Sequence, residues 1–233
     1  MKEKKTGTWK IWAVTIFLFA IVVAATIRVS TLPVLNFTAK GSKVHIVIDP
    51  GHGGFDPGKV GTMGTLEKDV NLNISLKLRE ILIKSGYTVA MTREKDEALC
   101  GETTGKKKVE DLNARLAVID KEKPELTVSI HQNSYSAGTK GAQVFYYSGS
   151  EEGKRLANVL QETIKEEMGD GNHRVEKAND SYYMLKKSSG PFVIIECGFL
   201  SNPEEEKLLI SEDYQKKMAK AVAEGIEKFL YNE

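Results

Sequence analysis

The chain has 233 residues, of which 41% are hydrophobic and 28% charged, proportions typical of a globular protein rather than a disordered one. Its formal net charge is +1, but residues 1–28 hold five basic residues and one acidic residue, so residues 29–233 carry 28 basic and 31 acidic residues. A net charge of −3 gives no bulk electrostatic surface for nucleic acid, and we expect no nucleic-acid partner.

The first 28 residues are typical of a membrane-targeting segment. Lys2, Lys4, Lys5 and Lys10 precede an apolar run over residues 11–27. A helix of that length spans about 25 Å, just short of a bilayer core, and is longer than a signal-peptide core of about 7–15 residues. We expect an uncleaved anchor, with a signal peptide as the alternative, followed by a tether over 29–42. The lysines predict that the body lies in the cell envelope, outside the cytoplasmic membrane.

Residues 43–233 alternate between strand and helix patterns. In the helix predicted at 67–84, Val70, Ile74 and Leu78 recur at helical spacing, and Gly86 is suited to end it. The alternation predicts a single α/β domain with a largely parallel central sheet flanked by helices. The expected strands are 44–48, 87–92, 126–131, 142–147, 182–185 and 191–196, and the other expected helices are 109–121, 151–168, one beginning at Asn202-Pro203, and 212–231.

Four chemically active side chains fall at or near predicted strand ends. His52 follows the first strand, His131 closes the strand at 126–131, Glu196 closes the strand at 191–196, and Glu67 lies where a glycine-rich loop meets a helix. Ligands gather beyond the carboxyl ends of strands in open α/β sheets. Two imidazoles and a carboxylate suit a catalytic Zn²⁺ with an open position for water, and the second carboxylate then serves as a base.

Each of these residues also has a structural interpretation, and the residue chemistry alone leaves both open. His52 is then a polar loop residue, His131 a satisfied strand-end residue, and Glu67 a first-turn glutamate favoured by the helix dipole. Glu196 is hardest to explain in this way, because it follows five apolar or proline residues and needs a partner or a function.

Four stretches together resemble the zinc N-acetylmuramoyl-L-alanine amidases of the amidase-3 family. They are residues 48–54 (IDPGHGG), 66–72 (LEKDVNL), 129–134 (SIHQNS) and 195–202 (IECGFLSN). The resemblance implies a mixed, largely parallel six-stranded sheet, Zn²⁺ bound by His52, Glu67 and His131, and Glu196 as the catalytic residue. It also implies peptidoglycan as the substrate, cut at the amide between the lactyl group of N-acetylmuramic acid and L-alanine.

A finer resemblance concerns residues 94–108, which are similar to the germination-specific amidases of spore formers. It implies a role in spore-cortex maturation, in which removal of peptide stems permits muramic-δ-lactam formation. The alternatives are a general vegetative wall amidase, another zinc wall hydrolase such as a carboxypeptidase or deacetylase, and a catalytically dead wall-binding scaffold. An activating envelope protein stays open as a partner.

The remaining polar candidates have smaller expected roles. Asp49, Asp69 and Asn133 are candidates for orienting the histidines, with turn or helix-start roles as the alternative. Of the other histidines, we expect the one at position 45 to be structural and the one at 173 to be exposed. Two cysteines, at positions 100 and 197, do not make a disulfide scaffold, and we expect no bridge between them.

Overall fold

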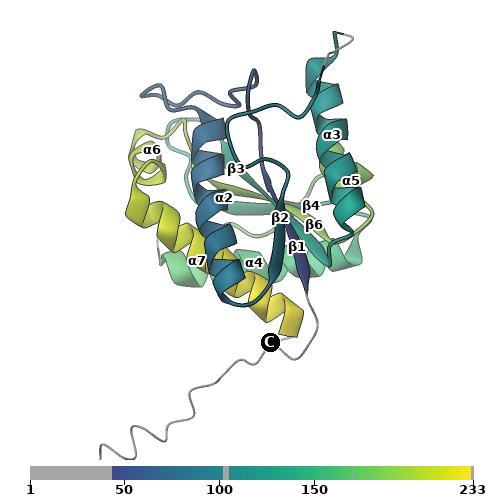
Figure 1. Cartoon of the computed structure of the whole chain (residues 1–233). Helices are drawn as coiled ribbons and strands as arrows, with labels where there is room; N and C mark the ends of the chain where they lie inside the picture. Colours follow the sequence, from purple (N-terminus) through teal and green to yellow (C-terminus); the bar gives the residue numbers. More distant parts are fainter. Residues whose placement is uncertain (1–43, 102–104, 170, 232–233) are drawn as a thin grey trace, which may run out of the picture. The chain divides into compact units, whose positions relative to one another are not determined.

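The computed structural model describes residues 44–101, 105–169 and 171–231 (Figure 1). The predicted leader and tether lie outside these ranges. The strands are β1 (His45–Pro50), β2 (Thr88–Met91), β3 (Leu126–Asn133), β4 (Gln143–Tyr146), β5 (Lys177–Ala178) and β6 (Phe192–Phe199). The helices are α2 (Glu67–Lys84), α3 (Lys107–Glu122), α4 (Glu151–Met168), α5 (Tyr183–Lys187), α6 (Pro203–Leu209) and α7 (Glu212–Tyr231).

The strands form one six-stranded sheet in the order β2-β1-β3-β6-β4-β5. Strand β1 runs parallel to β2 and β3, and β3 runs parallel to β6. Strand β4 is antiparallel to β6 and parallel to β5. The central strands are apolar on both faces because helices cover both faces, as is usual for parallel strands. The predicted single α/β domain with a mixed, largely parallel sheet is confirmed.

The two faces of the sheet carry different layers of helices. Figure 1 shows α2, α4 and α7 together on one side and α3 with α5 on the other. Strand side chains alternate between these layers, as the two-residue period of a strand requires. In β6, Ile195 packs in the core under α2, α4 and α7, whereas Ile194 packs with residues of α3 and α5. By the same alternation, Glu196 faces the α3–α5 side.

One predicted element is wrong, and one strand was missed. The segment 182–185 was expected to be a strand, but Tyr183–Lys187 form the short helix α5. The Asn179 side chain accepts hydrogen bonds from the backbone N–H groups of Ser181 and Tyr182, an Asx turn that leads the chain into a helical turn. Short apolar runs do not distinguish strand from helix by periodicity. The edge strand β5 has two exposed residues, which leave no hydrophobic pattern.

Two further expectations concern the membrane and the cysteines. No helix among the described residues has the length and apolar character needed to cross a bilayer. Cys100 is half-buried and Cys197 is buried, and both are free thiols.

Candidate active site

The loop after β1 brings His52 against His131 at the end of β3. The two imidazole centroids are 5.0 Å apart, with the rings nearly perpendicular. Gly51 makes this approach possible, because a Cβ atom added there would lie 2.2 Å from the His131 ring. His52 itself adopts a left-handed backbone conformation with φ of 61°, which is uncommon for a residue with a side chain. The surrounding loop therefore holds His52 in a conformation that a free chain would rarely populate.

Glu67, the first residue of α2, faces both imidazoles and is only 1% exposed. Its Oε1 lies 2.9 Å from Nδ1 of His131 and 3.2 Å from Nε2 of His52. Burial raises the pKa of Glu67, but hydrogen bonds and charge from the two histidines outweigh it and hold the pKa far below its usual range. Glu67 is therefore ionised. One possible ligand atom from each of His52, Glu67 and His131 lies within 4.8 Å of the other two.

This donor set fits a metal ion. Two imidazoles and one carboxylate converge on one point beside the cleft, and this donor set matches the three-ligand arrangement of catalytic zinc sites. The structure thus brings together the three residues that the sequence placed far apart at positions 52, 67 and 131.

Asp56 orients His52, a role that was not predicted from the sequence. Its Oδ2 lies 2.9 Å from Nδ1 of His52. A carboxylate in that position favours the tautomer with the proton on Nδ1, which leaves Nε2 free to bind a metal. The only signal in the sequence was that Asp56 follows His52 by four residues in the same loop.

Two of the three residues predicted to orient the histidines have other partners, and the third is exposed. Asp49 accepts hydrogen bonds from Arg115, Thr92 and Ser129, and Asn133 accepts one from the following backbone N–H. Asp69 is exposed at the start of α2. Among the described residues, no hydrogen bond joins any of these three to either imidazole.

Glu196 lies beside His131, since the two residues are register partners in β6 and β3. Its Oε1 accepts a hydrogen bond of 3.3 Å from the Tyr182 hydroxyl, whereas its Oε2 is buried without a hydrogen-bond partner. Burial raises the pKa of Glu196 to about 7; the charge of His131 opposes this rise and that of Glu67 adds to it. A buried acceptor without a partner is unusual in a native protein and indicates a function or a missing ligand.

These side chains line one cleft on the α3–α5 side of the sheet. A cavity of about 390 Å³ is lined by all four predicted site residues together with Lys59, Gln132, Asn133, Tyr182 and others. An adjoining cavity of about 210 Å³ shares both imidazoles and extends towards Phe55 and Arg115. The cleft therefore continues on both sides of the histidine pair.

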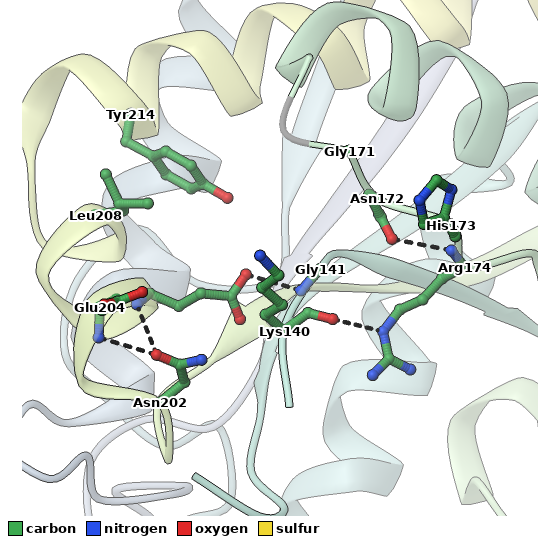
Figure 2. A pocket seen from close by; sticks show the side chains of 11 residues that line it. Lys140, Gly141, Gly171, Asn172, His173, Arg174, Asn202, Glu204, Leu208 and Tyr214 are labelled. Atoms are coloured by element: carbon green, nitrogen blue, oxygen red, sulfur yellow. Dashed lines mark hydrogen bonds between the residues drawn. The ribbon is translucent and has the colours of Figure 1, made fainter. Parts of the chain in front are cut away.

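Another pocket, of about 440 Å³, contains none of the four predicted site residues. Figure 2 shows Lys140 between Arg174 on one side and Asn202 with Glu204 on the other. The expected exposed histidine, His173, lines this pocket. The charged side chains of this pocket are mostly paired or exposed. The candidate catalytic site is therefore the cleft lined by His52 and His131.

Buried arginines hold the backbone beneath the histidines. Arg115 is 1% exposed, pairs with Asp49 at 2.8 Å, and donates to the Pro50 carbonyl. Arg93 donates to the carbonyls of Pro50 and Gly51. Hydrogen bonds from charged donors are roughly twice as strong as neutral ones, so this network fixes the end of β1 from which the loop departs.

The fold and the His–Glu–His cluster beside a buried glutamate define the class: a single-domain α/β enzyme with a candidate metal centre. The chain belongs to the N-acetylmuramoyl-L-alanine amidase family Amidase_3, whose model matches residues 46–228. It is thus an amidase that acts on the N-acetylmuramic acid–L-alanine bond of peptidoglycan, outside the cytoplasm. The predicted family and activity are confirmed, and a wall carboxypeptidase, a sugar deacetylase and a dead scaffold are set aside.

Known relatives resemble the chain over most of its length. It is 37% identical over 188 residues to the germination-specific N-acetylmuramoyl-L-alanine amidase of Bacillus subtilis, covering 79% of this chain and 78% of that one. The CwlD amidase from Clostridioides difficile, solved in complex with the GerS lipoprotein, is 42% identical with a TM-score of 0.78, covering 81% and 99%. AmiC2 of Nostoc punctiforme is 36% identical with a TM-score of 0.70, covering 82% and 98%.

Proposed function

We propose that His52, Glu67 and His131 bind Zn²⁺ and that Glu196 is the catalytic residue of this amidase. The observation that carries the proposal is the convergence of the three donors within 4.8 Å, next to a buried carboxylate oxygen that has no partner. The assignment of Zn²⁺ rests on the donor types, since imidazole and carboxylate with an open position suit catalytic zinc.

When bound, Zn²⁺ supplies Lewis acidity, which polarises the scissile carbonyl and lowers the pKa of water. The protein residues supply the rest. Tyr182 donates to Oε1 of Glu196, which lines the cleft, and Oε2 has no hydrogen-bond partner. Glu196 accepts a proton from the attacking water and returns it to the departing L-alanine nitrogen. Its raised pKa, about 7, suits both proton acceptance and proton donation near neutral pH.

Asp56→Ala is expected to weaken zinc binding by about 10–100-fold, the usual effect of removing a carboxylate that orients a metal-binding histidine. Without Asp56, His52 loses the partner of its Nδ1 and with it the preference for a free Nε2. Competition with a chromophoric chelator measures the zinc affinity. Asp96→Ala is a matched control, because Asp96 is an exposed carboxylate that pairs with Lys68 of α2 and accepts a hydrogen bond from the Gly54 backbone N–H in the same loop as His52. Equal zinc affinity for Asp56→Ala and the control would remove Asp56 from this role.

We propose further that the enzyme acts on the spore cortex during its maturation, where removal of stems allows muramic-δ-lactam to form. The support is the similarity to a germination-specific amidase and to CwlD. Deleting the gene is expected to leave vegetative growth normal and to give cortex without lactam, in spores that begin germination and stall. Muropeptide profiles of mutant spores measure this. Normal lactam content, or a defect in vegetative cell separation, would indicate a general wall amidase.

We also propose the chain organisation predicted above, with a membrane leader over 1–28, a tether over 29–42 and the catalytic domain over 43–233. In this arrangement the leader holds the enzyme on the outer face of the membrane. A C-terminal reporter enzyme that is active only outside the cytoplasm is expected to be active. An expressed but inactive fusion would invert the topology.

An activating envelope protein is part of the proposal. The relative CwlD was solved in complex with the GerS lipoprotein, and a lipoprotein at the membrane would meet a membrane-held amidase. Co-purification from sporulating cells tests it, and an enzyme that is fully active alone and captures no envelope protein would argue against a partner.

A further inference from the structure

Glu206 on α6 binds a loop that lies far away in the sequence. Its carboxylate accepts hydrogen bonds from the Thr62 hydroxyl at 2.6 Å, from the Met63 backbone N–H at 3.0 Å and from the Thr65 backbone N–H at 3.3 Å. The side chain is 0% exposed, and none of these contacts reaches the catalytic cleft. We name residues 58–66 the Glu67 loop, because they lead directly into that residue.

The tip of the Glu67 loop fits closely around the carboxylate. A Cβ atom added at Gly61 would lie 2.0 Å from Oε1 of Glu206. The backbone of Gly61 is outside the left-handed region, so the requirement for glycine is steric. Burial raises the pKa of Glu206, but hydrogen bonds from Thr62 and Thr65 outweigh it, so the pKa lies below its usual value. The ionised carboxylate of Glu206 thus accepts hydrogen bonds from several donors of the Glu67 loop at once.

The base of the Glu67 loop is joined to Glu67 itself. The Lys59 backbone N–H donates to Oε2 of Glu67 at 2.7 Å, and the Glu67 N–H donates to the Lys59 carbonyl at 2.9 Å. Val60 and Leu66 form a backbone bridge just above. With Oε2 held by Lys59, Oε1 is the oxygen that faces His52 and His131.

We propose that Glu206 is a positioning residue of the metal centre: it locks the Glu67 loop so that Oε1 of Glu67 faces the two histidines before a metal ion arrives. This inference rests on the proposed zinc function. A ligand already held in its bound orientation loses less conformational entropy on binding, and preorganisation therefore strengthens binding. Glu206 acts through the loop and touches neither substrate nor metal.

Two variants disturb this contact from opposite sides. Glu206→Gln replaces one acceptor oxygen with an amide group that cannot accept from the loop, and Gly61→Ala forces a methyl group against the carboxylate. Both are expected to weaken zinc binding of the full-length chain in detergent by about tenfold or more, the scale on which outer partners support a metal site. Excess Zn²⁺ should restore kcat with KM unchanged. In metal-free protein, backbone amides of residues 58–66 should exchange hydrogen faster.

Glu205→Gln is the matched control on the same helix. Glu205 is also buried, and it accepts hydrogen bonds from the backbone N–H groups of Gly141 and Phe199, away from the Glu67 loop. We expect a comparable loss of thermal stability with unchanged zinc affinity. Should Glu206→Gln fail to fold, Gly61→Ala carries the test.

Two results would overturn the inference. One is wild-type zinc affinity and a protected loop in both Glu206→Gln and Gly61→Ala. The other is an equal loss of zinc affinity in Glu205→Gln, which would show that only the stability of α6 matters. Failure of the zinc proposal gives a different signature, since the wild-type chain would then bind no Zn²⁺ while hydrogen exchange in the loop still reports the contact of Glu206.

Discussion

Glu196→Gln is expected to lower turnover of purified peptidoglycan by about two to four orders of magnitude, the usual contribution of general acid–base catalysis. Glutamine keeps the size of the side chain and can still accept the hydrogen bond from the Tyr182 hydroxyl, but it cannot take a proton from water. The release of free L-alanine amino groups measures turnover. Zinc content, measured on the same preparation, should equal that of the wild type.

The same variant makes a separate prediction about stability. Burial raises the pKa of Glu196 to about 7 in the folded chain, above its value of 4.5 in the unfolded chain. The fold therefore favours the protonated form, and stability falls as pH rises from about 4.5 to about 7 and stays reduced above it. Glutamine does not ionise, so the variant avoids the free-energy cost of the buried charge. The melting temperature of metal-free Glu196→Gln at pH 8 should therefore be no lower than that of the wild type.

For the activity prediction, turnover of Glu196→Gln near the wild-type rate would mean that the base lies elsewhere.

His131→Ala is expected to lose bound zinc and most activity. The change removes one of three donors, so zinc affinity should fall by more than about 100-fold, beyond the range for outer partners. It also leaves Oε1 of Glu67 without its 2.9 Å partner. Zinc per chain after gel filtration, measured by elemental analysis, checks the metal, and release of L-alanine amino groups checks activity.

The matched control is His173→Ala, because His173 is an exposed histidine that lines the other pocket (Figure 2). This variant should keep both zinc and activity. Stoichiometric zinc in His131→Ala would remove His131 from the ligand set, and equal losses in both variants would point to general damage.

Much of the fold follows from local patterns in the sequence. Helix α2 occupies 67–84 as predicted, because Val70, Ile74 and Leu78 recur at helical spacing and all pack in the core. The central strands are long apolar runs bounded by turn residues, which gives them a clear signal. The segments that failed are β5 and α5, two and five residues long, whose structures depend on tertiary contacts and on the Asx turn at Asn179.

The candidate site was predictable for a related reason. His131 and Glu196 are register partners in the carboxyl-terminal halves of the neighbouring parallel strands β3 and β6, and parallel strands place their carboxyl ends at one edge of the sheet. The supporting residues were not predictable in this way. Asp56, Tyr182 and Glu206 act through contacts between loops and short helices, and no periodicity encodes such contacts.

One measurement tests the zinc-dependent amidase mechanism most directly. Metal is removed from the full-length protein with a chelator, one equivalent of Zn²⁺ is added back, and wall digests are compared for newly exposed amino groups. The expected result is about one Zn²⁺ per chain and new free L-alanine amino groups that appear only with the metal, at a rate comparable to untreated enzyme. Full release of L-alanine amino groups by the metal-free protein, or release of a different amine on adding Zn²⁺, would contradict the mechanism.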